Sequence, residues 1–259
     1  MGARAAATHR LSWLVLAAGV LIFLASCSGG EAPSASVCAA APDLTPTPDP
    51  ANDLFANPSF EEGPQPWFSL TTEAWGRAFT VGQTEAHSGS SSAYLQLRSS
   101  DGGDTRVYGV AQEIAPNEFP HVLSGYYCVE RWHKNTPRQY LQFVVIINNA
   151  QNIPPEVTQL GASNHQLRYI LAGVSTQPTL VQNARYVFIT REPPKVGQWV
   201  HFERNIGRDV QQLWGDLPVG FTNIRILFEV RWDNRSPSDG ASEADVYYDD
   251  LYVGPAPGS

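Results

Sequence analysis

The sequence changes from tail-like to globular at Asn57-Pro58-Ser59-Phe60-Glu61-Glu62-Gly63, which is followed closely by Pro66-Trp67. This stretch combines a turn-forming Asn-Pro pair, two adjacent carboxylates, a glycine and aromatic side chains of a kind that is usually buried. A second acidic and aromatic stretch, Asp245-Val246-Tyr247-Tyr248-Asp249-Asp250-Leu251-Tyr252-Val253, lies near the other end of the chain. We expect the two stretches to meet in one domain, so that everything between them forms a single β-rich module.

Residues 1–26 have the pattern of a secretory signal. Arg4 and Arg10 precede an apolar run over residues 11–24, which is short for a membrane span. Leu24-Ala25-Ser26-Cys27 resembles the lipobox of bacterial lipoproteins, in which the cysteine is acylated and becomes the mature N-terminus. An ordinary secretory signal with a chance cysteine is the alternative. We predict a lipid on Cys27 and an extracytoplasmic protein anchored to the cell membrane or the outer membrane.

The charge balance of the mature chain is strongly acidic. The predicted signal carries two of the 17 basic residues and none of the 25 acidic ones, so the net charge becomes −10 after cleavage. This balance argues against nucleic acid and against an anionic membrane surface as partners.

Residues 27–53 are rich in Ser, Ala, Pro and Thr, and we expect an extended linker that separates the domain from the membrane. Cys38 lies in this linker, whereas Cys128 falls in a strand-like run. An oxidising compartment permits a disulfide between them. Cys128 also fits the role of a small buried side chain, so the sequence leaves the pairing open.

Residues 54–259 have the pattern of an all-β domain. Short runs of β-branched and aromatic residues alternate with Gly, Pro, Asn and Ser, and helical periodicity is almost absent. Residues 140–147 are apolar on both faces, which predicts a central strand. A helical turn is expected near residues 209–215, and either a short helix or a loop near 155–160. The predicted strands span residues 92–98, 106–114, 122–131, 139–148, 168–174, 185–190, 198–205, 224–231 and 245–253.

Several segments resemble the jelly-roll carbohydrate-binding modules of the cellulose- and xylan-binding, galactose-binding-domain-like type. The resemblance implies an all-β jelly-roll sandwich of two antiparallel sheets over residues 54–259. His121 or Val122 stands where the family usually has an aromatic residue, and residues 148–185 exceed the corresponding family segment, which predicts an inserted hairpin or lid. The matching segments, in the order of the family, are Asn57–Gly63 with Trp67, His87–Ala93, Val122–Tyr127, Gly197–Phe202 and Val246–Val253.

The family commonly holds a structural Ca²⁺ where its first segment meets its closing strand. The resemblance implies Glu61 and Asp249 as ligands, with Ser59 and the turn at Ser88 supplying further oxygens. Asp250 is the weaker candidate, because neighbouring residues of a regular strand face opposite sides. A hydrogen-bonded corner without metal is the alternative.

A sugar binder needs flat aromatic side chains beside planar polar groups. If Ile224, Ile226, Phe228 and Val230 face the core, the residues between them line an outer face. The alternative for each aromatic is packing in the core or at a sheet edge, which is the role we expect for Trp67 and Trp199. The predicted glycan-binding residues are Trp75, Tyr126, Trp132, Arg225, Glu229, Arg231 and Trp232.

We expect no catalysis, because the chain has no nucleophile, metal or phosphate motif. The adjacent pairs Glu61-Glu62 and Asp249-Asp250 do not place two carboxylates across a cleft, as glycoside hydrolysis requires. The sequence therefore predicts non-catalytic binding of a polysaccharide or glycan by a lipid-anchored protein. The alternative is a structural or protein-interaction module of a surface complex, which keeps the fold without sugar binding. A third interpretation is an accessory subunit of a surface complex that docks through residues 148–185.

Overall fold

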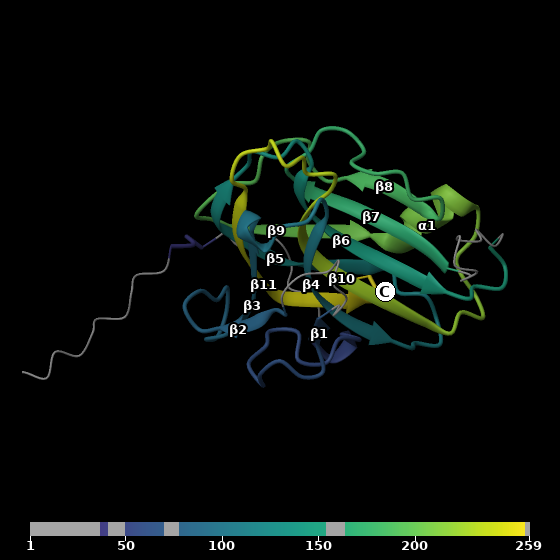
Figure 1. Cartoon of the computed structure of the whole chain (residues 1–259). Coiled ribbons are helices and arrows are strands. Elements are labelled where there is room, and N and C mark those ends of the chain that lie inside the picture. Colours follow the sequence, from purple (N-terminus) through teal and green to yellow (C-terminus); the bar gives the residue numbers. More distant parts are fainter. Residues whose placement is uncertain (1–36, 41–49, 70–77, 154–163, 257–259) are drawn as a thin grey trace, which may run out of the picture. The chain divides into compact units, whose positions relative to one another are not determined.

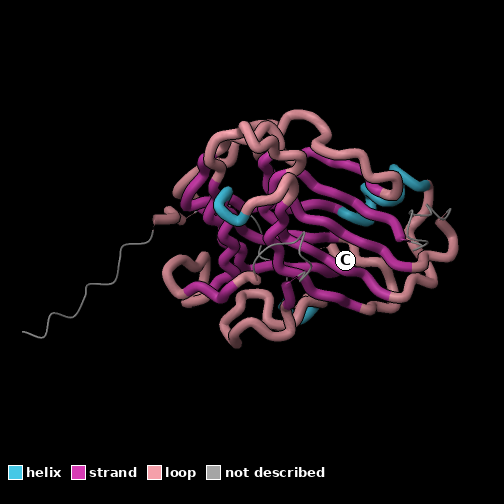
Figure 2. The backbone as a smooth tube through the Cα atoms, viewed as in Figure 1, coloured by secondary structure: helices cyan, strands magenta, loops and turns pink. Residues whose placement is uncertain are grey.

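The computed structural model describes residues 37–40, 50–69, 78–153 and 164–256, which form two packed β-sheets (Figures 1 and 2). The predicted signal, Cys27, Trp75 and the helix or loop at 155–160 lie outside these residues. None of the described helices is long and apolar enough to cross a membrane.

The larger sheet has the strand order β1-β4-β10-β6-β7-β8. Neighbouring strands are antiparallel except β7 and β8, which are parallel. Since β6 lies in the sheet interior between β10 and β7, the prediction of a central strand is confirmed. The strands are β1 (Phe68–Ser69), β4 (Arg106–Ile114), β6 (Gln139–Asn148), β7 (Asn164–Ala172), β8 (Ala184–Phe188) and β10 (Asn223–Trp232).

The smaller sheet has the order β2-β3-β11-β5-β9. Its strands β3, β11, β5 and β9 correspond in order to β4, β10, β6 and β7 of the larger sheet. From β3 to β6 the chain alternates between the two sheets, with β3 and β5 in the smaller sheet and β4 and β6 in the larger one. This is the double Greek-key order of a jelly roll, so the predicted fold class is confirmed. The strands are β2 (Thr80–Gly82), β3 (Ser92–Arg98), β5 (Val122–His133), β9 (Trp199–Asn205) and β11 (Glu243–Gly254).

The described helical elements are short. Helix α1 (Ile206–Trp214) is longer than the single turn expected near 209–215. Asn205 caps its N-terminus, because its side chain accepts a hydrogen bond from the Arg208 N–H. Gly215 caps its C-terminus with a φ of 96°, a conformation that favours glycine. Two 3₁₀ turns, Pro50–Asn52 and Ser99–Asp101, complete the described helical structure.

The predicted insertion at 148–185 contributes to the sheet in its described part. Strand β7 pairs with β6 over its whole length, and β8 adds a parallel edge strand beside it. The described part of this segment therefore widens the larger sheet.

Phe228 of β10 lies at the centre of the core between the sheets. Its ring centroid is 5.5 Å from that of Tyr248 on β11 and 6.0 Å from that of Phe202 on β9. The rings of Trp67 and Phe143 each lie 6.2 Å away. The opening segment of the domain therefore packs in the same core as both sheets, and the predicted packing role of Trp67 is confirmed.

The two ends of the domain meet, as the sequence predicts. The Leu54 N–H donates to the Val253 carbonyl at 2.8 Å, and the Leu251 N–H donates to the Pro58 carbonyl at 3.2 Å. These backbone bonds place the Asn57–Gly63 stretch directly against the closing strand β11.

A disulfide joins Cys38 to Cys128 of β5, with the two Cα atoms 6.2 Å apart. Beside it, Ala39 forms a parallel bridge with Gln198, and the N–H groups of Val37 and Cys38 donate to the Glu85 carboxylate. Residues 37–40 of the expected linker are thus held against the domain upstream of residue 54. The two roles that the sequence left open for Cys128 coincide, since this cysteine is both fully buried and bonded.

We expect the double variant Cys38→Ser/Cys128→Ser to lower the free energy of unfolding by about 2–4 kcal/mol, because the disulfide closes a loop with a sequence separation of 90 residues. Urea unfolding with and without reducing agent measures the effect. Reducing agent should destabilise the wild type and leave the double variant unchanged. Equal stability of the wild type and the variant would contradict the prediction.

Candidate functional site

The outer face of the six-stranded sheet carries polar and aromatic side chains that solvent reaches. Strand alternation turns Ile224, Ile226 and Phe228 of β10 into the core, so Arg225 faces outward. The pairing of strands places the outward side chains in two adjacent rows. Phe68, Arg168 and Tyr186 share one row with the buried residues Ala111, Leu227 and Val144 between them, and Glu113, Arg225, Ile146 and Gln166 form the other. We call the following set the outer track: Phe68, Glu113, Ile146, Gln166, Arg168, Tyr186 and Arg225.

An arginine stacked near an aromatic ring lies at each end of the outer track. The Arg225 guanidinium is 5.7 Å from the centre of the Phe68 ring, and its Nε donates to Glu113 at 2.7 Å. The Arg168 guanidinium is 5.9 Å from the centre of the Tyr186 ring, and it donates to Oε1 of the Gln166 side chain at 2.7 and 3.0 Å. Six strands spaced by about 4.8 Å make the track roughly 24 Å long.

Strand β8 adds a second aromatic side chain on the same face. Tyr186 and Phe188 are two residues apart, so their side chains point the same way about 7 Å from each other. Tyr140, Ile170 and Val174 pack beside them. A strand is predicted here at residues 185–190, but Tyr186 and Phe188 are not among the predicted site residues, although their two-residue spacing indicates a shared face.

Glu229 and Arg231 lie on the predicted face but are shielded from solvent. Glu229 is 1 % exposed and accepts a 2.6 Å hydrogen bond from Gln142. Arg231 is 7 % exposed and donates to Asp233 at 2.5 Å. Of the three polar residues predicted on β10, only Arg225 is therefore available to a ligand in this arrangement.

Trp232 does not line the outer face, which corrects the prediction. It is fully buried in the core, because it continues the inward series of Ile224 to Val230 at two-residue spacing. A tryptophan at the end of that series belongs to the core face.

Trp132 also points inward, for a different reason. A register shift opposite Asp245 and Val246 inserts Glu130 as an extra residue in β5. Beyond the bulge Trp132 pairs with Ala244 and packs against the core, half-buried. Regular alternation, which the prediction assumed, fails at this point.

Tyr126 faces outward, but from the five-stranded sheet. Its ring stacks on His87 with centroids 3.5 Å apart, and His201 lies 4.9 Å away. The predicted residues therefore do not form one platform: Tyr126 and Arg225 lie on different sheets. Trp199, expected in packing, is buried beside Cys38, Cys128 and Tyr247, which confirms that assignment.

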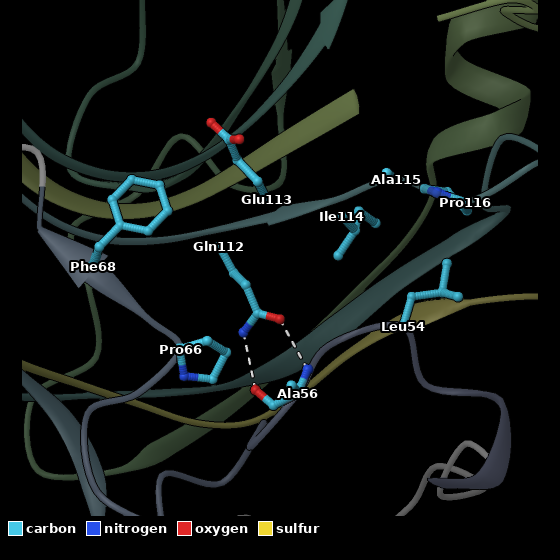
Figure 3. Close-up of a pocket in the computed structure, with 9 residues that line it drawn as sticks. All are labelled: Leu54, Ala56, Pro66, Phe68, Gln112, Glu113, Ile114, Ala115 and Pro116. Atoms are coloured by element: carbon cyan, nitrogen blue, oxygen red, sulfur yellow. Dashed lines mark hydrogen bonds between the residues drawn. The ribbon is translucent and has the colours of Figure 1, made fainter. Parts of the chain in front are cut away.

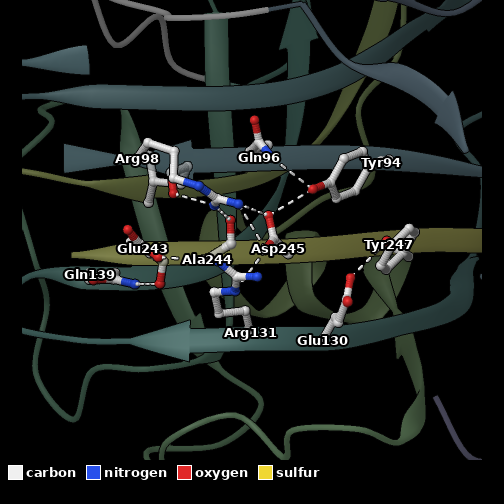
Figure 4. A network of polar contacts seen from close by, with 11 residues as sticks. Tyr94, Gln96, Arg98, Glu130, Arg131, Gln139, Glu243, Ala244, Asp245 and Tyr247 are labelled. Carbon is white, nitrogen blue, oxygen red and sulfur yellow. Dashed lines mark hydrogen bonds and ion pairs between the residues drawn. The ribbon is translucent and has the colours of Figure 1, made fainter. Parts of the chain in front are cut away.

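The outer face of the five-stranded sheet is occupied by its own polar network (Figure 4). The buried Asp245 carboxylate accepts hydrogen bonds from Arg98 at 2.6 and 2.9 Å and from the Tyr94 hydroxyl at 2.8 Å, and Arg131 lies 3.2 Å away. Tyr94 stacks on Tyr247 with ring centroids 4.8 Å apart. Burial, and then the hydrogen bond to Asp245, raise the pKa of Tyr94 to about 12. These groups satisfy one another, which is typical of a structural network.

The opening segment and β11 hold the loop His87–Ser91 between them, and we call this arrangement the clasp. Glu61 Oε1 accepts from the N–H groups of Ser90 and Ser91 at 2.8 and 2.7 Å. Asp249 Oδ2 accepts from those of His87 and Ser88 at 2.7 and 3.2 Å. The Ser90 N–H group in particular lowers the pKa of Glu61, while Glu62 is exposed, as expected.

Asp250 does not face away from Asp249, contrary to the prediction. Its carboxylate binds the same loop, through His87 Nδ1 at 2.6 Å and Ser88 Oγ at 2.7 Å. The reason is the irregularity of β11 after Asp249, where Asp250 has a φ of 46° and alternation breaks.

The clasp has the donor chemistry of a hard-cation site. Burial raises the pKa of Asp249 to about 8, and the neighbouring charge of Asp250 adds to the rise. Among the described residues, no Lys or Arg forms an ion pair with Glu61, Asp249 or Asp250, so the excess negative charge would favour a cation. The described residues bring together no group of three or more His, Cys, Asp or Glu suited to a metal. To hold a hard cation, which takes six to eight oxygen ligands, Glu61 and Asp249 would therefore need hydroxyl and carbonyl oxygens as additional ligands.

A cavity of about 510 Å³ adjoins the outer track at its β1–β4 end (Figure 3). Gln112 forms one wall and is bonded through its amide to both backbone groups of Ala56 at 2.9 Å. Phe68 and Glu113 belong both to this cavity and to the track. The lining residues are Leu54, Ala56, Pro66, Phe68, Gln112, Glu113, Ile114, Ala115 and Pro116.

No family model and no curated protein matches the chain. Among solved structures, the chain is similar to TmCBM61, described in complex with β-1,4-galactotriose, at 13 % identity and a TM-score of 0.40, covering 78 % of this chain and 97 % of that one. It is similar to the enzymatically active domain of bacteriophage CBA120 tailspike protein 4 at 14 % identity and a TM-score of 0.40, covering 80 % and 22 %. It is also similar to CBM28, a carbohydrate-binding module specific for non-crystalline cellulose, at 13 % identity and a TM-score of 0.36, covering 77 % and 93 %. The fold assignment rests on the strand order of the two sheets.

Proposed function

We propose that this protein binds a glycan chain, without catalysis, along the outer track of the six-stranded sheet. The observation that carries the proposal is the pair of arginine–aromatic stacks at the two ends of the outer track, whose side chains are partly exposed. Sugar rings combine apolar faces with hydroxyl groups, so they match flat aromatic surfaces flanked by planar donors and acceptors. Arg225, Arg168 and Gln166 supply those polar groups.

Binding fits this face better than hydrolysis does. Glycoside hydrolysis requires two carboxylates on opposite sides of the scissile bond. The two carboxylates that β4 and β10 place here are Glu113, which is paired with Arg225, and Glu229, which is shielded by its contact with Gln142. Neither of them is free to serve as an acid or a nucleophile in this arrangement.

We expect Tyr186→Ala to weaken glycan binding about five- to thirtyfold, because the change removes the apolar platform at one end of the track. The test is titration calorimetry of the full-length protein in detergent, after a glycan array has identified a binder, with β-1,4-galactotriose and cellotetraose as first probes. Arg225→Ala should weaken binding at the other end of the track.

Tyr126→Ala is the matched control for this experiment, because it removes an outward tyrosine from the opposite sheet. It should leave glycan affinity unchanged. Loss of binding in Tyr126→Ala alone would move the site to the other face. A flat array, together with a protein partner captured through residues 164–185, would favour the interaction module instead.

The anchor is a proposal that rests on the lipobox-like sequence at Cys27. In cells fed a labelled fatty acid, we expect the wild type to carry the label and to sediment with membranes, and Cys27→Ala to lose the label and appear in the soluble fraction. Cys38→Ser is the control and should stay labelled. A labelled Cys27→Ala variant would refute the proposal.

We also propose that the clasp binds Ca²⁺ through Glu61 and Asp249, with Ser59 and Ser88 supplying further oxygens. When bound, the ion would neutralise the carboxylates that join the two ends of the domain.

The melting midpoint of the protein in EDTA should be lower, by about 5 °C or more, than that of the protein in Ca²⁺ at a concentration of roughly 100 times the Kd for Ca²⁺. Added Ca²⁺ should restore the midpoint, and Mg²⁺ should not. Glu61→Gln should abolish the calcium response, whereas Glu62→Gln, at the exposed neighbour, should retain it. Identical midpoints with and without EDTA would show that the clasp works through hydrogen bonds alone.

A further inference from the structure

A second cavity, of about 390 Å³, lies where loops meet beyond strands β6, β7 and β8. The β5–β6 loop, the segment after β7 and the segment after β8 each form part of its wall. Its size falls in the range of small-ligand sites. The lining residues are Lys134, Pro137, Arg138, Gly173, Val174, Ser175, Thr176, Gln177, Pro178, Arg191 and Pro193.

The cavity is lined by three cations and by no acidic residue. This is unexpected in a chain whose formal net charge is −8. Lys134 Nζ donates to the Gly173 carbonyl at 2.5 Å, and Arg191 donates to the Ser175 carbonyl. Within the described parts of the chain, none of the three cations forms an ion pair, and the Arg138 side chain makes no hydrogen bond.

Two acidic residues whose backbones contact the cavity segments, Asp233 and Glu192, do not line the cavity. Asp233, whose N–H donates to the Arg138 carbonyl, directs its carboxylate to Tyr140 and Arg231. Glu192 is exposed and contributes its backbone carbonyl to the Gly173 N–H. Partial burial lowers the pKa of Lys134, as expected for a cation that loses water without gaining a carboxylate partner. The cavity therefore has unused positive charge and unused N–H donors.

The cavity adjoins the aromatic residues of β8. The Arg191 guanidinium lies 4.0 Å from the centre of the Phe188 ring, and Phe188 shares its face with Tyr186 of the outer track. Val174 belongs both to the cavity wall and to the cluster that packs beside these rings. A glycan chain bound at Tyr186 would therefore lie close to Arg191, which lines the cavity.

We propose that this cavity is a subsite for an acidic sugar residue, whose carboxylate or sulfate group accepts hydrogen bonds from Lys134, Arg138 and Arg191. Stacking on Phe188 holds the Arg191 guanidinium in place, so little side-chain freedom is lost on binding. The inference rests on the proposed function and makes it more specific: the glycan carries negative charge. Charge-assisted hydrogen bonds of this kind separate acidic from neutral chains more strongly than apolar stacking does.

The experiment compares three probes on the full-length protein in detergent by titration calorimetry: trigalacturonate for a carboxylate, a sulfated galactose trisaccharide for a sulfate, and galactotriose as the neutral counterpart. We expect at least one acidic probe to bind ten times or more tighter than galactotriose. That preference should decline as salt rises from about 0.05 to 0.5 M, because screening weakens the charge interaction. Which acidic probe binds tighter distinguishes carboxylate from sulfate.

In the double variant Lys134→Gln/Arg138→Gln, the affinity for the acidic probe should fall about tenfold or more, so that the preference over galactotriose is lost. The affinity for galactotriose should not change. The matched control is Lys195→Gln/Arg208→Gln, which removes the same charge from two exposed residues outside the cavity lining and should keep the preference. Unchanged melting midpoints show that both variants are folded.

Equal binding of acidic and neutral probes, or an equal loss of preference in both double variants, would overturn the subsite and leave the proposed function standing. A preference that responds to Tyr186→Ala but not to Lys134→Gln/Arg138→Gln would likewise overturn it. Failure of every saccharide to bind, across the array and these probes, would overturn the proposed function and the subsite together.

Discussion

The packing of aromatic rings around Phe228 is the constraint on which the rest of this structure depends. Rings from both sheets and from the opening segment converge on this one residue of β10. Burying a side chain of this size contributes about 1.5–3 kcal/mol, and the neighbouring rings gain the same kind of energy. Because β10 must direct Ile224, Ile226, Phe228, Val230 and Trp232 inward, Arg225 has no position but the outer face.

The two outer faces of the sandwich use their polar side chains differently. On the five-stranded sheet, Asp245 gathers Arg98, Arg131 and Tyr94, so opposite charges are matched within the protein. On the six-stranded sheet, Arg225 is paired with Glu113 and Arg168 is bonded to Gln166, and it is the cavity beyond β8 that holds three cations without a carboxylate. Charge left unmatched within the protein is available to a ligand, which is why we place recognition on this side.

Prediction from sequence was most successful where a regular two-residue period persisted. Residues 92–98 alternate and form a strand with the predicted bounds. The bounds of 106–114 and 139–148 are also as predicted, the second from its continuous apolar run. Prediction failed where the two-residue period broke. Glu130 is an extra residue in β5, so Trp132 points inward. The irregularity of β11 at Asp250 lets the carboxylates of Asp249 and Asp250 bind the same loop. Both are bulges, and a bulge is set by the partner strand across the sheet, which the local pattern of residues does not identify.

The sequence by itself determined the all-β class, the inward series on β10 and the outward direction of Arg225. These follow from alternation and burial, which act on each strand separately. Only the tertiary structure decided that Tyr126 and Arg225 lie on different sheets, that Cys38 reaches Cys128, and that Phe68, Arg168 and Tyr186 align with Arg225. The reason is physical: side chains come together across strands through pairing and register, and these depend on contacts between residues far apart in the chain. The stretch Asn57–Gly63 belongs to both categories. Its turn and the burial of Phe60 are predictable from the sequence, whereas the contact of Glu61 with the loop His87–Ser91 depends on the tertiary structure.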